Sequence, residues 1–175
     1  MPTLLFYALS AWLPTILLTT GMSPLQAGAM LSLVNIAAVP TALAMGILVN
    51  RTRQQVWATT VTSALLGAGM LGFLAVRAEA AILWMVLLGI GLGGGTAIGY
   101  ALPLLRSPDV STTAKLTAMS QTAGFLLCAL GPVAVGALHD LTRSWTPALM
   151  VLAALTVLQA LAGIQAGRKR FVHYR

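Results

Sequence analysis

Charged residues in this chain occur only in short clusters separated by long charge-free stretches, and this spacing constrains the fold more than any other feature. No Asp, Glu, Lys or Arg occurs in the first 50 of the 175 residues. Only 7% of all residues are charged, whereas a soluble domain usually has about 25%. So few charges cannot cover a water-exposed surface. The sequence therefore predicts an all-α polytopic membrane protein.

The charged clusters and turn signals divide the chain into six candidate transmembrane helices. A Gly-Met-Ser-Pro turn at 21–24 splits the first charge-free stretch in two. A hydrocarbon core of about 30 Å needs roughly 20 helical residues, and only the first helix is shorter, as if it were the later part of a longer one. We expect a six-helix bundle over 1–167 and a basic tail over 168–175, with helices at 3–19, 25–49, 56–76, 80–105, 116–138 and 145–167.

The positions of Lys and Arg in the loops predict the orientation. A cytoplasmic N-terminus and an even number of spans leave only Arg77 and Arg143 outside the cytoplasm. This positive-inside bias predicts a multi-pass protein of the cell inner (plasma) membrane with a cytoplasmic C-terminus. The basic tail is expected to contact anionic lipid, so the net charge of +7 does not indicate a nucleic-acid partner. The cytoplasmic set is Arg51, Arg53, Arg106, Lys115, Arg168, Lys169, Arg170 and Arg175.

The second and fifth predicted helices carry a matching pattern. The second contains Pro40 and ends in Gly-x-x-x-Asn at 46–50, and the fifth contains Pro132 and ends in Gly-x-x-x-Asp at 136–140. In the predicted topology these two helices leave the membrane on opposite sides. Inverted three-helix repeats of this kind build many secondary transporters, so the six helices are interpreted as three plus three.

Polar and small residues on these two helices recur every three or four positions, so each set lies on one helix face. Helix packing is the favoured interpretation for the glycines and alanines. For Asn35 and Gln121 a cavity wall is an equal alternative, because an unpartnered amide in hydrocarbon is costly. Tyr7 shares a face with Ser10 and Pro14 and is another cavity candidate. The two stripes are Gly28, Ser32, Asn35, Ala42 and Gly46, with Val39 filling the gap between Asn35 and Ala42, and Thr117, Gln121, Gly124, Cys128 and Gly131.

The fourth predicted helix is rich in glycine. Gly91, Gly95 and Gly99 recur every fourth residue and predict a face for close contact with a neighbouring helix. The spacing Gly89-x-Gly91-x-x-Gly94 does not indicate a nucleotide site, because no strand precedes it and the segment lies in a charge-free run.

Side chains for catalysis or metal binding are scarce. No charged residue or histidine lies in the middle of a predicted span, and Cys128 is the only cysteine, which excludes an internal disulfide. An intramembrane serine protease needs a histidine base beside its serine. The two histidines are His139, at a helix end, and His173, in the tail. We therefore expect no enzyme activity, no metal and no cofactor.

The loop after the second predicted helix, Gly46-x-x-x-Asn50-Arg51-x-Arg53, resembles the Gly-x-x-x-Asp-Arg-x-Gly-Arg motif of the major facilitator superfamily. Asn replaces the acidic residue and Arg the following glycine, a departure that is usual for the later of that family's two loops. From about Leu4 to Gly167, the chain is similar to the C-terminal half of the cyanate/2-nitroimidazole (CynX/NimT) branch. The segments that carry this resemblance are 6–14, 21–28, 106–109, 119–121 and 131–142.

This resemblance implies that the chain forms helices seven to twelve of a twelve-helix carrier that works by alternating access. It implies a small-molecule substrate, such as a small anion like cyanate or a nitroimidazole-like compound. It also implies a partner, an N-terminal six-helix half in the same or a separate chain. The implied cavity residues are Tyr7, Trp12, Asn35, Tyr100 and Gln121, and the implied cytoplasmic gate is Gly46, Asn50, Arg51 and Arg53.

Two alternatives keep the same fold. The six helices could act as a homodimeric carrier, with one chain for each half. The chain could also be a non-transporting remnant of a broken transporter gene, which would agree with its short first helix.

Overall fold

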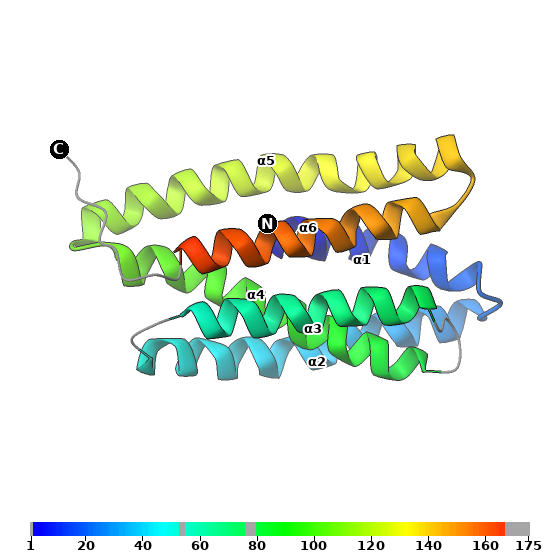
Figure 1. Cartoon of the computed structure of the whole chain (residues 1–175), viewed down its shortest axis with the longest axis horizontal. Coiled ribbons are helices and arrows are strands. Elements are labelled where there is room, and N and C mark those ends of the chain that lie inside the picture. The colour runs from blue at the N-terminus through cyan, green and yellow to red at the C-terminus, as the bar shows by residue number, and fades with distance from the viewer. Residues whose placement is uncertain (1, 53–54, 76–79, 167–175) are drawn as a thin grey trace.

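The computed structural model describes residues 2–52, 55–75 and 80–166, and these residues form an antiparallel bundle of six α-helices. The helices run up and down along one long axis (Figure 1). Five of them are long and apolar enough to cross a membrane, and α1 is shorter, with 17 residues. The predicted all-α class is confirmed. The helices are α1 (Pro2–Leu18), α2 (Pro24–Arg51), α3 (Val56–Ala75), α4 (Ala81–Arg106), α5 (Val110–Thr142) and α6 (Trp145–Ala166).

The predicted helix ends lie within two residues of the observed ones except in α5. That helix was expected over 116–138, but it begins six residues earlier and ends four residues later. Asp109 caps its start by accepting from the Thr112 backbone N–H, and Arg143 ends it in a left-handed conformation. Charged and polar residues end a membrane span but not a helix, so the expected bounds were too narrow. The expected ends at 76 and 167, and the basic tail, lie outside the described residues.

The two three-helix repeats interleave. The second helix of each repeat lies mainly along the first helix of the other, so α2 pairs with α4 and α5 pairs with α1. The third helices, α3 and α6, lie against each other. Figure 1 shows that α2 and α5 end at opposite ends of the bundle, as the predicted inverted repeat requires.

The core is formed mostly by α1, α3, α4 and α6. Leucines of α1, such as Leu5, Leu13 and Leu17, belong to the main cluster of buried side chains together with Met85 and Leu88 of α4. In the most apolar window of α4, 56% of the residues are buried, compared with 17% in α2 and 22% in α5. The outer faces of α2 and α5 therefore present large apolar side chains on the surface of this bundle.

Glycines on α4 allow two neighbouring helices to come close. A Cβ atom on Gly89 or Gly93 would collide with a backbone carbonyl oxygen of α2, and one on Gly91 would lie 2.7 Å from the backbone nitrogen of Leu66 in α3. The three glycines expected to pack against one neighbouring helix lie in two environments. Gly91 lies against α3, whereas Gly95 and Gly99 line a pocket. The seam with α2 uses Gly89 and Gly93, which sequence analysis did not assign to packing.

Candidate functional site

Two adjoining pockets lie between α1, α2, α4 and α5, with volumes of about 270 and 120 Å³. We call them together the front cavity. They share the lining residues Thr3, Thr96 and Tyr100, so they form one continuous depression. Tyr7 and Asn35 line the larger part, and Gln121 lines the smaller part. Four of the five residues expected to face a substrate therefore meet in one place, from four different helices.

The polar groups of the front cavity are neutral and retain hydrogen-bonding capacity. Asn35 donates from Nδ2 to the carbonyl of Leu31 at 3.0 Å, which leaves its Oδ1 oxygen to accept. Thr96 donates to the carbonyl of Leu92 at 2.7 Å and keeps its oxygen lone pairs. Tyr7 and Tyr100 are 46% and 48% exposed, so a ring face of each is accessible. This set can stack on a flat molecule and hydrogen-bond its edge.

Among the described residues, those that line the front cavity include no Asp, Glu, Lys, Arg or His. In the part of the chain that the structure describes, no group of three or more His, Cys, Asp or Glu side chains could hold a metal ion. The described lining of the front cavity therefore offers neutral hydrogen-bonding groups and aromatic rings.

Trp12 lies apart from the other four candidates. Its Nε1 donates to the carbonyl of Pro132 at 2.7 Å, and its ring lies 5.3 Å from that of Trp145. A Cβ atom on Gly136 would lie 2.7 Å from the Trp12 ring, so the ring fills the space beside this glycine. Trp12 thus joins α1 to α5 and α6 and is absent from the lining of the front cavity. The sequence predicted that Trp12 lies within the membrane span, but it did not indicate which face of the helix carries this side chain.

The loop motif forms the last turn of α2. Asn50 donates from Nδ2 to the carbonyl of Gly46 at 2.9 Å, one turn earlier in the same helix. Asn50 and Arg51 are exposed, and a Cβ atom on Gly46 would meet nothing within 4 Å. Arg53 lies outside the described residues. This turn is not part of the front cavity.

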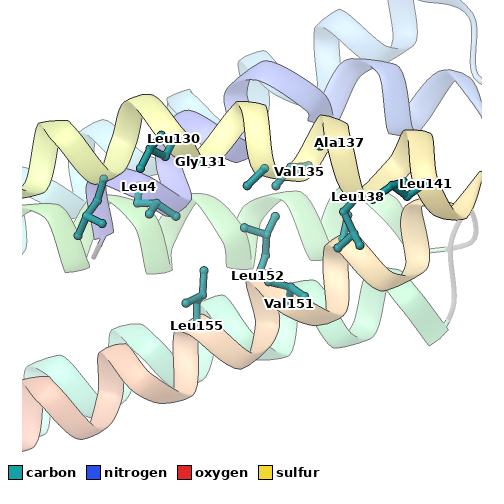
Figure 2. Close-up of a pocket in the computed structure, with 13 residues that line it drawn as sticks. Leu4, Leu130, Gly131, Val135, Ala137, Leu138, Leu141, Val151, Leu152 and Leu155 are labelled. Atoms are coloured by element: carbon teal, nitrogen blue, oxygen red, sulfur yellow. The ribbon is translucent and has the colours of Figure 1, made fainter.

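Figure 2 shows a different kind of pocket, between α5 and α6 beside the start of α1, with leucine side chains projecting into it. Its volume is about 410 Å³, and all its lining side chains are apolar or glycine. It has no side chain that could hydrogen-bond a polar solute. Hydrocarbon, including lipid chains, is the chemistry that matches it.

A fourth pocket, of about 420 Å³, lies between α3, α4 and α6, and we call it the rear pocket. Sequence analysis missed it. Four of its polar lining residues are buried, namely Thr59, Thr62 and Ser63 of α3 and Gln159 of α6, and a fifth, Ser120 of α5, is exposed. Two features of the sequence could have indicated this pocket. The three hydroxyl residues are spaced so that they share one face of α3, and the amide Gln159 lies within the largely apolar α6.

This architecture defines a multi-pass α-helical membrane protein with two polar pockets within the bundle. The chain is 35% identical to the uncharacterized transporter YycB of Bacillus subtilis over 173 residues, which are 98% of this chain and 43% of that protein. It is 32% identical to the 2-nitroimidazole transporter of Escherichia coli over 168 residues, or 96% and 42% of the two proteins. It is 37% identical over 114 residues to a Thauera aromatica protein named for anionic 4-hydroxy-benzoate permease activity, which is 65% of this chain and 69% of that protein.

The chain therefore belongs to this transporter family, as a C-terminal half of the major facilitator fold that resembles the CynX/NimT branch. It spans less than half the length of the first two relatives. These relatives are transporters rather than enzymes. No protein-family model matches the chain. No solved structure matches it either.

Proposed function

We propose that this chain is the C-terminal half of a secondary transporter that moves a small polar solute by alternating access. The observation that carries the proposal is the convergence of Tyr7, Asn35, Tyr100 and Gln121 on the front cavity. The family membership of the chain supports the same function. The solute must contact the inward- and outward-open states differently, because only differential binding shifts their equilibrium.

The substrate class that fits the front cavity is a small planar molecule with hydrogen-bonding edges. The two tyrosine rings suit a flat π-system, and the two amides suit its polar edge. A nitroimidazole-like compound meets this description. A small anion such as cyanate would also find donors here, but its countercharge would come from the other half, since the residues that line the front cavity are neutral.

A six-helix partner would cover the exposed apolar faces of α2 and α5. In the proposed carrier this partner is the N-terminal half, and Gly46, Asn50, Arg51 and Arg53 act at the cytoplasmic gate between the halves. The exposure of Asn50 and Arg51 at the end of α2 supports a contact with a partner.

The first test removes the two amides in the complete carrier, with N35L and Q121L. Each change should lower solute uptake per molecule by about tenfold, because the loss of a hydrogen bond of about 1.4 kcal/mol weakens binding tenfold. T122V is the matched control, since Thr122 is exposed on α5 and does not line the front cavity. A loss of protein with unchanged uptake per molecule would assign the amides to helix packing instead.

Reconstitution separates the half-carrier from its homodimeric alternative. The purified chain alone in liposomes should not take up solute, whereas the chain together with an N-terminal half should. Uptake by the chain alone would favour the homodimer. Failure of the reconstituted pair, with both halves folded, would favour the non-transporting remnant.

The proposed location is the inner membrane, with the C-terminus in the cytoplasm. In a background in which Cys128 is changed to Ser, T142C should react with an impermeant thiol reagent added to intact cells, and S111C should not. Figure 1 shows the two corresponding ends of α5 at opposite ends of the bundle. The reverse pattern of labelling would invert the proposed orientation.

A further inference from the structure

We propose that the rear pocket binds a small uncharged molecule that carries an N–H or O–H donor. The pocket lies against a different face of α4 from the front cavity, between α3 and α6. Its volume of about 420 Å³ far exceeds the roughly 30 Å³ that one water molecule occupies in the liquid.

Gln159 provides the first argument, because half of its amide is unpaired. The side chain is 7% exposed. Its Nε2 donates to Ser63 Oγ at 3.3 Å, whereas Oε1 is buried and has no hydrogen-bond partner among the described residues. Buried amide oxygens in folded proteins are nearly always paired. Among the described residues no group donates to this oxygen, and a ligand that carries a donor would satisfy it.

The hydroxyl groups of α3 provide the second argument. Thr62, which is 1% exposed, donates to the carbonyl of Ala58 at 2.8 Å. Thr59 likewise donates to the carbonyl of Val56 at 2.8 Å. Both hydroxyl hydrogens are used within the helix, so the oxygens remain only as acceptors. The few polar groups in the largely apolar wall of the rear pocket therefore include these two acceptors, and a ligand that hydrogen-bonds to them must bring the donors.

The charge of the ligand follows from the lining. Among the residues that the structure describes, no Asp or Glu lines the rear pocket. A cation taken from water into a buried site without a carboxylate would lose its hydration without adequate compensation. An uncharged donor carries no such penalty.

The space itself depends on glycine. Gly95 and Gly99 of α4 line the pocket without side chains. Gly163 lets α6 approach α3 closely, since a Cβ atom there would lie 2.8 Å from Thr59 Cβ. Gly99 and Ser120 also line the smaller part of the front cavity. The rear pocket thus adjoins the front cavity.

The test uses cysteine accessibility in membranes that contain the full chain, with Cys128 changed to Ser. S63C should react with a small methanethiosulfonate at least about ten times faster than V61C, because this chemistry needs an ionised, hydrated thiol. Val61 is the matched control, since it lies two residues away on α3 and is 45% exposed on the outer surface of the bundle. If S63C does not accumulate, A162C reports on the same pocket from α6.

Two related amides then test the requirement for a donor. Acetamide carries N–H donors and should slow the modification of S63C, whereas N,N-dimethylacetamide has none and should protect much less. Modification of S63C no faster than that of V61C would overturn the proposal, and so would equal effects of the two amides.

A stability measurement gives an independent outcome. Q159M replaces the amide by an apolar side chain of similar length. If the pocket is occupied as proposed, Q159M should lower the midpoint of thermal unfolding, because the bound donors lose their acceptor. A higher midpoint would mean that the unpaired oxygen faces an empty pocket, and would overturn the proposal.

Discussion

Helices α2 and α5 are counterparts in the inverted repeat, yet they contact their partner helices in opposite ways. On α2 the backbone itself is the contact surface, because Gly89 and Gly93 of α4 lie against its carbonyl groups. On α5 the helix provides the glycine, and the Trp12 ring of α1 fills the space beside Gly136. The two helices thus share a pattern of proline and glycine without sharing a mode of contact. The residues of the partner helix determine how close the two can come.

The last turns of the two helices differ in their side-chain hydrogen bonds. Asn50 donates from its amide to the carbonyl of Gly46. Asp140, at the corresponding position, has no amide N–H with which to make the same bond to Gly136. The backbone closes both ends, because the Thr52 N–H donates to the carbonyl of Val49 at 3.4 Å and the Arg143 N–H donates to the carbonyl of His139 at 2.7 Å.

The largest effect should come from filling the seam between α2 and α4. G93A forces the Cβ atom against the Ala38 carbonyl, and overpacking of this kind costs about 1–3 kcal/mol. Thermal unfolding of the purified chain in detergent should show a clearly lower midpoint. G46A is the control, because a Cβ atom there would meet nothing within 4 Å, and it should be neutral or stabilising. Equal midpoints for G93A and G46A would contradict a backbone-to-backbone seam.

A smaller loss of stability should follow from adding a methyl group to Gly136, where α5 contacts the Trp12 ring of α1. In G136A the Trp12 ring can turn aside, so the main loss is its hydrogen bond to the Pro132 carbonyl, worth about 1 kcal/mol. W12F removes the same bond, so the double variant should lose less than the sum of the two single variants. Unfolding curves of the three variants check this expectation. Strict additivity would show that Gly136 and Trp12 act separately.

The smallest expected effect is a loss of stability at the N-terminal cap of α5, but not of α2, at acidic pH. Hydrogen bonds from the backbone N–H and hydroxyl of Thr112 lower the pKa of Asp109 below its ordinary value. The stabilisation is therefore complete above the ordinary pKa and is lost as the pH falls through the lower, folded-state pKa, which means below about pH 4. Ser23 and Gln26, which form a capping box at the start of α2, do not ionise in this range.

Hydrogen exchange can compare the two caps directly. Between pH 5 and pH 3, protection should fall at Thr112 and Thr113 but not at Gln26 and Ala27. D109N keeps a capping side chain and should remove the response to acid. A similar loss of protection at both helices would point to general unfolding rather than to the cap of α5.

Much of this fold could be predicted from the sequence, because prolines, glycines and charges marked most helix ends. The ends of α5 could not, since Asp109 and Arg143 close a helix that extends beyond its apolar segment. For the front cavity, the spacing placed Asn35 and Gln121 each on one helix face. Trp12 and the rear pocket depend on which helices become neighbours. Which helices become neighbours depends on how their side chains fit together across the bundle. The periodicity of residues along one helix gives no information about that fit.

The length of α5 also bears on how the protein fits membranes of different thickness. Its 33 residues extend about 50 Å, well beyond a hydrocarbon core of about 30 Å. α3, with 20 residues, extends about 30 Å and only just spans that core. In a thicker bilayer, lipid can cover more of α5 at little cost, whereas the ends of α3 would be drawn inward. Hydrophobic mismatch therefore falls on the two shortest helices, α1 and α3, and α3 contributes part of the wall of the rear pocket.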